Sequence, residues 1–219
     1  TNFFTGTLLS LTVVIITFAL FASFQARRSQ RSIYSAFAVV TACSLFHVAF
    51  IYLIPVLLLG FMLMQSMNMR SLLAMGMGIV TPFWIVLGLD LASFSDFIIH
   101  PYGNLWAELD ISQLRVNIIC IVFIATATIV LTCVNLIQII NYKQQARAYN
   151  GFFVYLAAAS ILMLAIDYRN AMVYLPVINL CFAVQFGHFF AFNNRLRRYL
   201  IVVFLILAVI ATHILHIAL

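Results

Sequence analysis

The sequence predicts an all-α fold: a polytopic transmembrane helical bundle with about eight membrane segments, two of which form one short hairpin. Hydrophobic residues make up 66% of the 219 residues and charged residues only 7%, whereas soluble domains are roughly 45–50% apolar and about 25% charged. Long apolar runs, such as residues 7–24 and 118–140, approach the roughly 20 residues that cross about 30 Å of hydrocarbon. The alternation that a β-barrel requires is missing, which leaves helices as the spanning elements.

The apolar stretch at residues 33–65 leaves two topologies open. It follows a first span at residues 6–24 and a basic cluster: Arg27, Arg28, Arg31. A single helix of this length, at about 1.5 Å per residue, would be roughly 50 Å long and would exceed the whole bilayer, about 40–45 Å. The stretch must therefore tilt as one bent span, or break between residues 46 and 55, where Pro55 weakens the helix, and form a hairpin.

The distribution of charge favours the hairpin, because Lys and Arg are enriched in the cytoplasmic loops of membrane proteins. With a hairpin, all of the eleven basic residues except Arg115 and Arg169 lie on one side, and all five acidic residues lie on the other. One bent span would separate the first basic cluster from the others. The later spans are then expected at residues 71–92, 116–140, 151–166, 171–192 and 199–218.

We expect a single transmembrane domain over residues 1–219, with one substantial extramembrane segment, the outer loop at residues 91–114. A turn signal at residues 100–104 precedes an apolar stripe. This pattern predicts a short interfacial helix that begins at Asn104 and carries Trp106 at head-group level. The chain opens at Thr1 without a methionine, which fits either processing or the C-terminal part of a longer chain.

Ionisable groups inside the hydrocarbon are the usual functional candidates in a membrane protein, and none falls in the middle of a predicted span. This argues against an ion-coupled pump. Gln185 and His188, three residues apart near the cytoplasmic end of the seventh span, are candidate substrate or lipid contacts, although a helix–helix hydrogen bond is the simpler interpretation. A structural role is also preferred for His47 near the hairpin turn and for His213 with His216, since two histidines do not make a metal site.

Charged residues collect on the predicted outer side, and they are the candidate catalytic residues. The candidates are Asp90, Asp96, Arg115, Asp167 and Arg169. Carboxylates beside arginines can bind metal ions, phosphates or sugars, and membrane-embedded transferases that use polyprenyl-phosphate sugars place catalytic acids on the external face. A solvated surface also carries charge for topological reasons alone, so both interpretations stay open.

The run from Gly76 to Trp84 predicts a bent helix that a neighbour approaches closely. Gly76 and Gly78 permit the approach, while Pro82 interrupts the helical bonding, which Thr81 partly replaces. Pro82 is therefore a further candidate for substrate or lipid contact.

The four cysteines lie in apolar runs and are expected to be small buried packing residues. They are Cys43, Cys120, Cys133 and Cys181. The sequence has no P-loop, zinc-protease or nucleophile-elbow motif. We expect no cofactor, no metal and no nucleic-acid partner.

Several short stretches resemble a family of uncharacterised Bacteroidota polytopic inner-membrane proteins. The matching segments are residues 21–25, 33–37, 44–46, 52–55, 69–71, 78–84 and, more loosely, 187–190. The resemblance implies a bacterial inner membrane, further membrane segments upstream of Thr1, and no established activity. In an inner membrane, the orientation predicted from the charges makes the C-terminus and the outer loop periplasmic. Some members carry a carotenoid-oxygenase label, but the four histidines of such an iron site are not placed to converge here.

Three functions remain open at this point. The first is a non-enzymatic scaffold or subunit in envelope assembly or transport, with membrane lipids and other membrane-protein subunits as partners. The second is a transferase or carrier for a polyprenyl-linked sugar, whose outward-facing acids would converge on one cavity. The third is a small-solute or lipid transporter, lined by Gln185, His188 and the bend at Pro82, with a midplane cavity between broken helices.

Overall fold

The computed structural model describes residues 2–26, 29–90, 111–139, 142–167 and 170–192, with isolated positions between 199 and 206. Within these ranges the chain forms helices and no strand. The elements are α1 (Asn2–Ala22), α2 (Gln30–Phe46), the 3-10 helix η1 (Val48–Phe50), α3 (Leu53–Leu63), α4 (Met69–Gly88), α5 (Ile111–Ile139), α6 (Gln144–Ile166) and α7 (Ala171–Phe192). The side chains of residues 111–120, at the start of α5, lie outside this description.

Five of these helices, α1, α4, α5, α6 and α7, are long and apolar enough to cross a membrane. The other two segments are shorter: α2 has 17 residues, and η1 with α3 forms the apolar segment Val48–Leu63. The fold is therefore an all-helical one that fits a membrane protein. The predicted last segment at residues 199–218 lies largely outside the described residues, and so do residues 91–110 with the expected interfacial helix.

The long apolar stretch breaks within the predicted interval. α2 ends at Phe46 because His47 adopts an extended conformation, with φ −155° and ψ 126°. The His47 Nδ1 accepts a hydrogen bond from the N–H of Ala49 at 3.1 Å and so caps η1. His47 thus has the structural role that was expected of it. The expectation that Pro55 weakens the helix at the break is wrong, because Pro55 lies in the first turn of α3, where its missing N–H removes no helical hydrogen bond.

After the break the chain doubles back, and two hydrogen bonds establish this. The N–H of Gln25, before α2, donates to the carbonyl of Met64, after α3, at 3.1 Å. The Ser29 hydroxyl donates to the carbonyl of Ser66 at 3.0 Å. Both ends of the stretch therefore lie together, and the hairpin, not the single bent span, is the arrangement of these residues.

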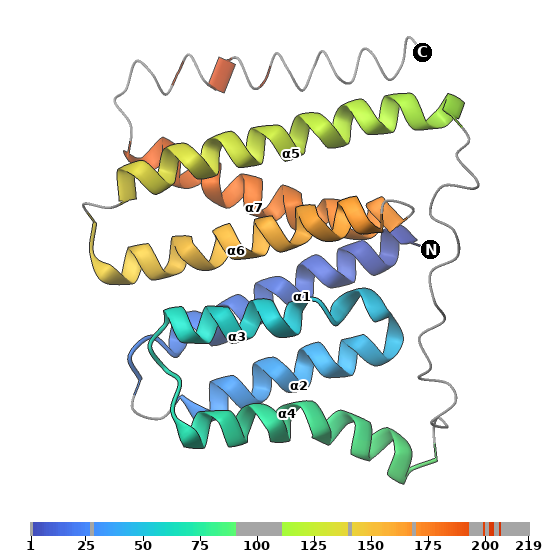
Figure 1. The fold of residues 1–219 in the computed structure, drawn as a ribbon, viewed down its shortest axis with the longest axis vertical. Coiled ribbons are helices and arrows are strands. Elements are labelled where there is room, and N and C mark those ends of the chain that lie inside the picture. The colour runs from blue at the N-terminus through green and yellow to red at the C-terminus, as the bar shows by residue number, and fades with distance from the viewer. Residues whose placement is uncertain are drawn as a thin grey trace.

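Consecutive helices run in opposite directions (Figure 1). The ends of α1 and α3 meet the start of α6, where the ring of Phe21 stacks on that of Tyr149 with 3.9 Å between centroids. The described Lys and Arg side chains lie at this end, which we call the basic end: Arg31, Arg70, Lys143, Arg147. The described carboxylates, Asp90 and Asp167, lie at the opposite end, the acidic end, where the hairpin turns. The described residues thus show the predicted segregation of charge.

Large aromatic side chains fill the interior of the bundle. Fully buried examples are Phe37, Phe50, Phe61, Phe152 and Tyr174. Gly60 of α3 makes room for Phe152 of α6, because a Cβ at Gly60 would lie 2.8 Å from the phenyl ring. Helix α3 of the hairpin therefore packs closely against α6.

The cysteines follow the prediction only in part. Cys181 is buried and Cys43 is half-buried, whereas Cys133 is exposed. The prediction of burial is wrong for Cys133, because this residue lies on the outward, apolar face of α5, where a thiol can act as a small hydrophobic group. The side chain of Cys120 is outside the described residues.

Candidate functional site

Helices α2 and α4 run parallel and are in close contact near the basic end. The hydroxyl oxygens of Ser29 and Ser71 lie 3.2 Å apart, and the Ser71 hydroxyl donates to the carbonyl of Ser66 at 2.9 Å. Further along, a Cβ at Gly78 would lie 2.7 Å from the carbonyl oxygen of Tyr34. Only glycine permits this distance, so the predicted close approach is confirmed at Gly78. It is wrong for Gly76, because that residue faces away from α2 and nothing lies within 4 Å of a Cβ there.

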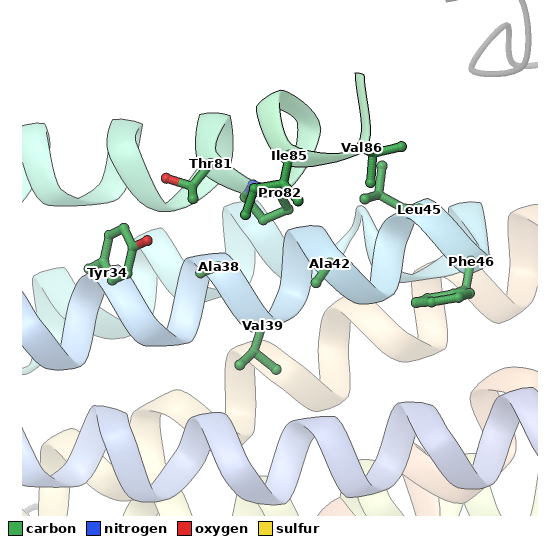
Figure 2. A pocket seen from close by; sticks show the side chains of 10 residues that line it. All are labelled: Tyr34, Ala38, Val39, Ala42, Leu45, Phe46, Thr81, Pro82, Ile85 and Val86. Carbon is green, nitrogen blue, oxygen red and sulfur yellow. The ribbon is translucent and has the colours of Figure 1, made fainter. Parts of the chain in front are cut away.

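Beyond Gly78, α4 turns away from α2 (Figures 1 and 2). Pro82 has no N–H to donate to the carbonyl of Gly78, and its ring crowds that carbonyl, which bends the helix. The hydroxyl of Thr81 donates to the carbonyl of Met77 at 2.6 Å, a type of bond that also bends helices. Thr81 thus adds a bond one residue before the carbonyl that Pro82 leaves without its usual donor.

The divergence of the two helices leaves a groove between their C-terminal halves, the α2/α4 groove. Its volume is about 620 Å³, within the roughly 300–1,000 Å³ of pockets that bind small ligands. The lining residues in Figure 2 are Tyr34, Ala38, Val39, Ala42, Leu45 and Phe46 of α2, with Thr81, Pro82, Ile85 and Val86 of α4. Pro82, a candidate contact from the sequence, is one of them.

The lining of the α2/α4 groove is almost entirely apolar. Ala38 and Ala42, one turn apart on α2, present small side chains to the space beneath α4 (Figure 2). Large apolar side chains of both helices are also exposed, with Phe46 84% exposed and Trp84 73% exposed. A charged ligand would find no ionic partner in this lining, whereas an alkyl or isoprenoid chain would contact apolar atoms along its length.

A second site lies at the acidic end, where α6 ends and α7 begins. Asp167 is only 3% exposed. Its carboxylate accepts hydrogen bonds from Asn170 Nδ2 at 3.1 and 3.0 Å and from the Tyr174 hydroxyl at 3.0 Å. Among the described residues, no Lys or Arg forms an ion pair with it. Neutral donors therefore satisfy this buried carboxylate.

Aromatic side chains connect Asp167 to the hairpin. The ring of Tyr174 packs edge-on against that of Tyr52, with centroids 5.8 Å apart, and the Tyr52 hydroxyl lies 3.2 Å from Ser160 Oγ. Sequence reasoning missed both tyrosines, because an aromatic residue in an apolar run looks like ordinary core. Asp167 ends α6 and Tyr174 lies on α7, so helical spacing gave no signal for this contact.

The other predicted catalytic residues do not join Asp167 in the described structure. Asp90 follows the end of α4, is exposed, and has a φ of 52°, a conformation that Asp tolerates. Asp96 and Arg169 lie outside the described residues, and so does the side chain of Arg115. Where the structure describes side chains, no three His, Cys, Asp or Glu residues are grouped so that they could hold a metal ion.

Gln185 of α7 contacts α5. Asn135 Nδ2 donates to the Gln185 backbone carbonyl and to its Oε1, both at 2.7 Å. The simpler interpretation of Gln185, a hydrogen bond between helices, is thus confirmed. His188, one turn further along α7, is half-buried. Sequence reasoning did not single out Asn135, since one amide in a long apolar run gives no indication of its partner.

Comparisons with protein-family models, with curated proteins and with solved structures find no match to this chain. Three features are available: the α2/α4 groove, the buried carboxylate of Asp167, and the amide contact between α5 and α7. The groove has room for a ligand and a nearly uniform apolar lining, so it is the best candidate for a ligand site.

Proposed function

We propose that this chain is a multi-pass component of a bacterial inner membrane that acts without catalysis and binds one hydrocarbon chain of a membrane lipid in the α2/α4 groove. The observation that carries the proposal is the groove itself. It lies between two apolar helices, has about 620 Å³ of space, and has exposed apolar side chains beside it. A lipid chain is the apolar ligand that a bilayer supplies at this position.

The direction of the bundle in the membrane is part of the proposal. The described Lys and Arg side chains lie at the basic end, and such residues are enriched on the cytoplasmic side. With the basic end in the cytoplasm, the groove lies in the outer half of the bilayer. Its ligand then comes from the outer leaflet, and the C-terminus and the loop after Asp90 are periplasmic.

Filling the groove tests the proposal. Ala42→Phe places a phenyl ring in the space beneath α4, whereas Ala158→Phe changes an exposed alanine of α6 and serves as the matched control. Each protein is purified in a mild detergent, and the lipids that remain bound are counted by native mass spectrometry. We expect the wild type and Ala158→Phe to retain a lipid that Ala42→Phe loses. Equal lipid retention by all three proteins would contradict the proposal.

A second candidate function is the transfer of a polyprenyl-linked sugar, and the buried carboxylate of Asp167 is the observation that favours it. Transferases of this kind need an acid at the outer surface, and Asp167 lies at the acidic end beside Tyr174. The double variant Asp90→Asn, Asp167→Asn should insert normally, since neither residue lies within a span. If this variant supports full function in cells, the transferase is excluded.

A further inference from the structure

In the described part of α5, several polar side chains are buried while many apolar ones are exposed. The exposed side chains include Val122, Ile129, Val130, Leu136 and Ile137. The buried face carries Thr128, Thr132 and Asn135, which are 0%, 9% and 3% exposed. A helix surrounded by lipid turns apolar groups outward, and polar groups that it turns inward are paired with a neighbour or line a polar site.

The contact between Asn135 and Gln185 leaves half of each amide unused. Asn135 Nδ2 donates one hydrogen bond to the Gln185 backbone carbonyl and one to Gln185 Oε1. The backbone carbonyl can only accept, so it fixes the orientation of the Asn135 amide. Asn135 Oδ1 and Gln185 Nε2 are consequently left over, and both are buried without a partner.

Two further side chains of α5 also have a buried polar atom without a hydrogen-bond partner. Thr132 Oγ1 and Gln138 Oε1 are also buried and unpaired. Thr132, Asn135 and Gln138 are spaced three residues apart, so that each lies next to the following one on the surface of α5. Three oxygens and one amide N–H2 therefore stay unsatisfied within about two helical turns. Nearly all buried polar groups in native proteins are hydrogen-bonded, and hydrocarbon offers no partner.

We infer that this polar contact of α5 and α7 is a binding site for a small neutral molecule that has both a hydrogen-bond acceptor and a donor: water, or a small carboxamide. The acceptor would take the free N–H of Gln185 Nε2, and the donor would bond to Asn135 Oδ1. The unpaired atoms on these side chains belong to amides and a hydroxyl, all uncharged, so a neutral ligand matches them better than an ion. This site is separate from the α2/α4 groove, because it lies between different helices.

Acetamide is the probe for an organic ligand, because it carries one carbonyl and one N–H2 group. The thermal unfolding midpoint of the purified full chain in mild detergent is measured against acetamide concentration. N,N-dimethylacetamide, which keeps the carbonyl but has no N–H, is the control ligand. Gln185→Met removes Nε2 but keeps the backbone carbonyl that holds Asn135, and Gln144→Met, at an exposed position, is the matched control protein.

We expect acetamide, but not N,N-dimethylacetamide, to raise the midpoint of the wild type and of Gln144→Met, and the shift to be lost in Gln185→Met. If water is the ligand, acetamide has no such effect, and a high-resolution experimental map shows an ordered water within hydrogen-bond distance of Asn135 Oδ1 and Gln185 Nε2. The absence of both the shift and the water overturns the inference. So does a higher midpoint for Gln185→Met than for the wild type, since removal of an unpaired amide would then stabilise the chain.

Discussion

Gly78→Ala is expected to destabilise the protein, although alanine is the better helix former. A Cβ at position 78 would lie 2.7 Å from the carbonyl oxygen of Tyr34 and 3.1 Å from the Cβ of Phe37. Ordinary contact begins at 3.4 Å, so α4 would have to retreat by 3.4 − 2.7, about 0.7 Å. Overpacking of this kind costs about 1–3 kcal/mol, whereas the gain from replacing a helical glycine is about 0.5–1 kcal/mol. The overpacking term is the larger one.

Gly76→Ala is the matched control, because nothing lies within 4 Å of a Cβ at Gly76. It is two residues away on the same helix, so both variants gain the same helix propensity and only one meets a neighbour. Reversible unfolding in mixed micelles, followed by circular dichroism, compares their free energies of unfolding. We expect Gly78→Ala to be less stable than Gly76→Ala by roughly 1–3 kcal/mol, the overpacking cost. Equal stability of the two variants would refute the contact of α4 with α2 at Gly78.

Two further predictions concern the acidic end and the orientation. Tyr174→Phe removes the hydroxyl that donates to buried Asp167 and should cost about 1–3 kcal/mol of stability. Tyr155→Phe, at an exposed position, is the control and should leave the thermal unfolding midpoint unchanged. Equal midpoints for the two variants would contradict the role of Tyr174. The orientation is tested in a variant that lacks all native cysteines. In intact cells, Asp90→Cys at the acidic end should react with a membrane-impermeant thiol reagent, and Arg70→Cys at the basic end should not. The reverse pattern would overturn the proposed orientation.

Much of the fold could be predicted from the sequence, because two strong signals set it. The length of the apolar stretch at residues 33–65 required a bend or a break, and the arginines on both sides of it favoured a hairpin. The bonds from Gln25 to Met64 and from Ser29 to Ser66 now show the doubling back. The start of α6 was less predictable: α6 begins at Gln144, seven residues before the predicted start at residue 151, since a helix can extend beyond its apolar part.

The candidate sites could be predicted less well, because they depend on contacts between helices. Pro82 was recognised as a bend, but the α2/α4 groove also needs the small side chains of Ala38 and Ala42 opposite it, and a sequence does not show which helices are neighbours. Asn135 illustrates the same difficulty, since its partner Gln185 lies 50 residues away. The spacing of residues along the sequence reveals neighbours on the same helix, but it does not reveal which residues of two different helices are in contact.

The position of the α2/α4 groove follows from how α4 is attached. α4 has 11% of its span buried, against 39% for α6 and for α7, because it packs mainly against one neighbour, α2. The hydroxyls of Ser29 and Ser71 around the carbonyl of Ser66 lie at the basic end, and the close backbone approach of α4 to α2 is at Gly78. Because the attachment is concentrated in one half of α4, the other half can diverge at Pro82 without breaking any of these bonds.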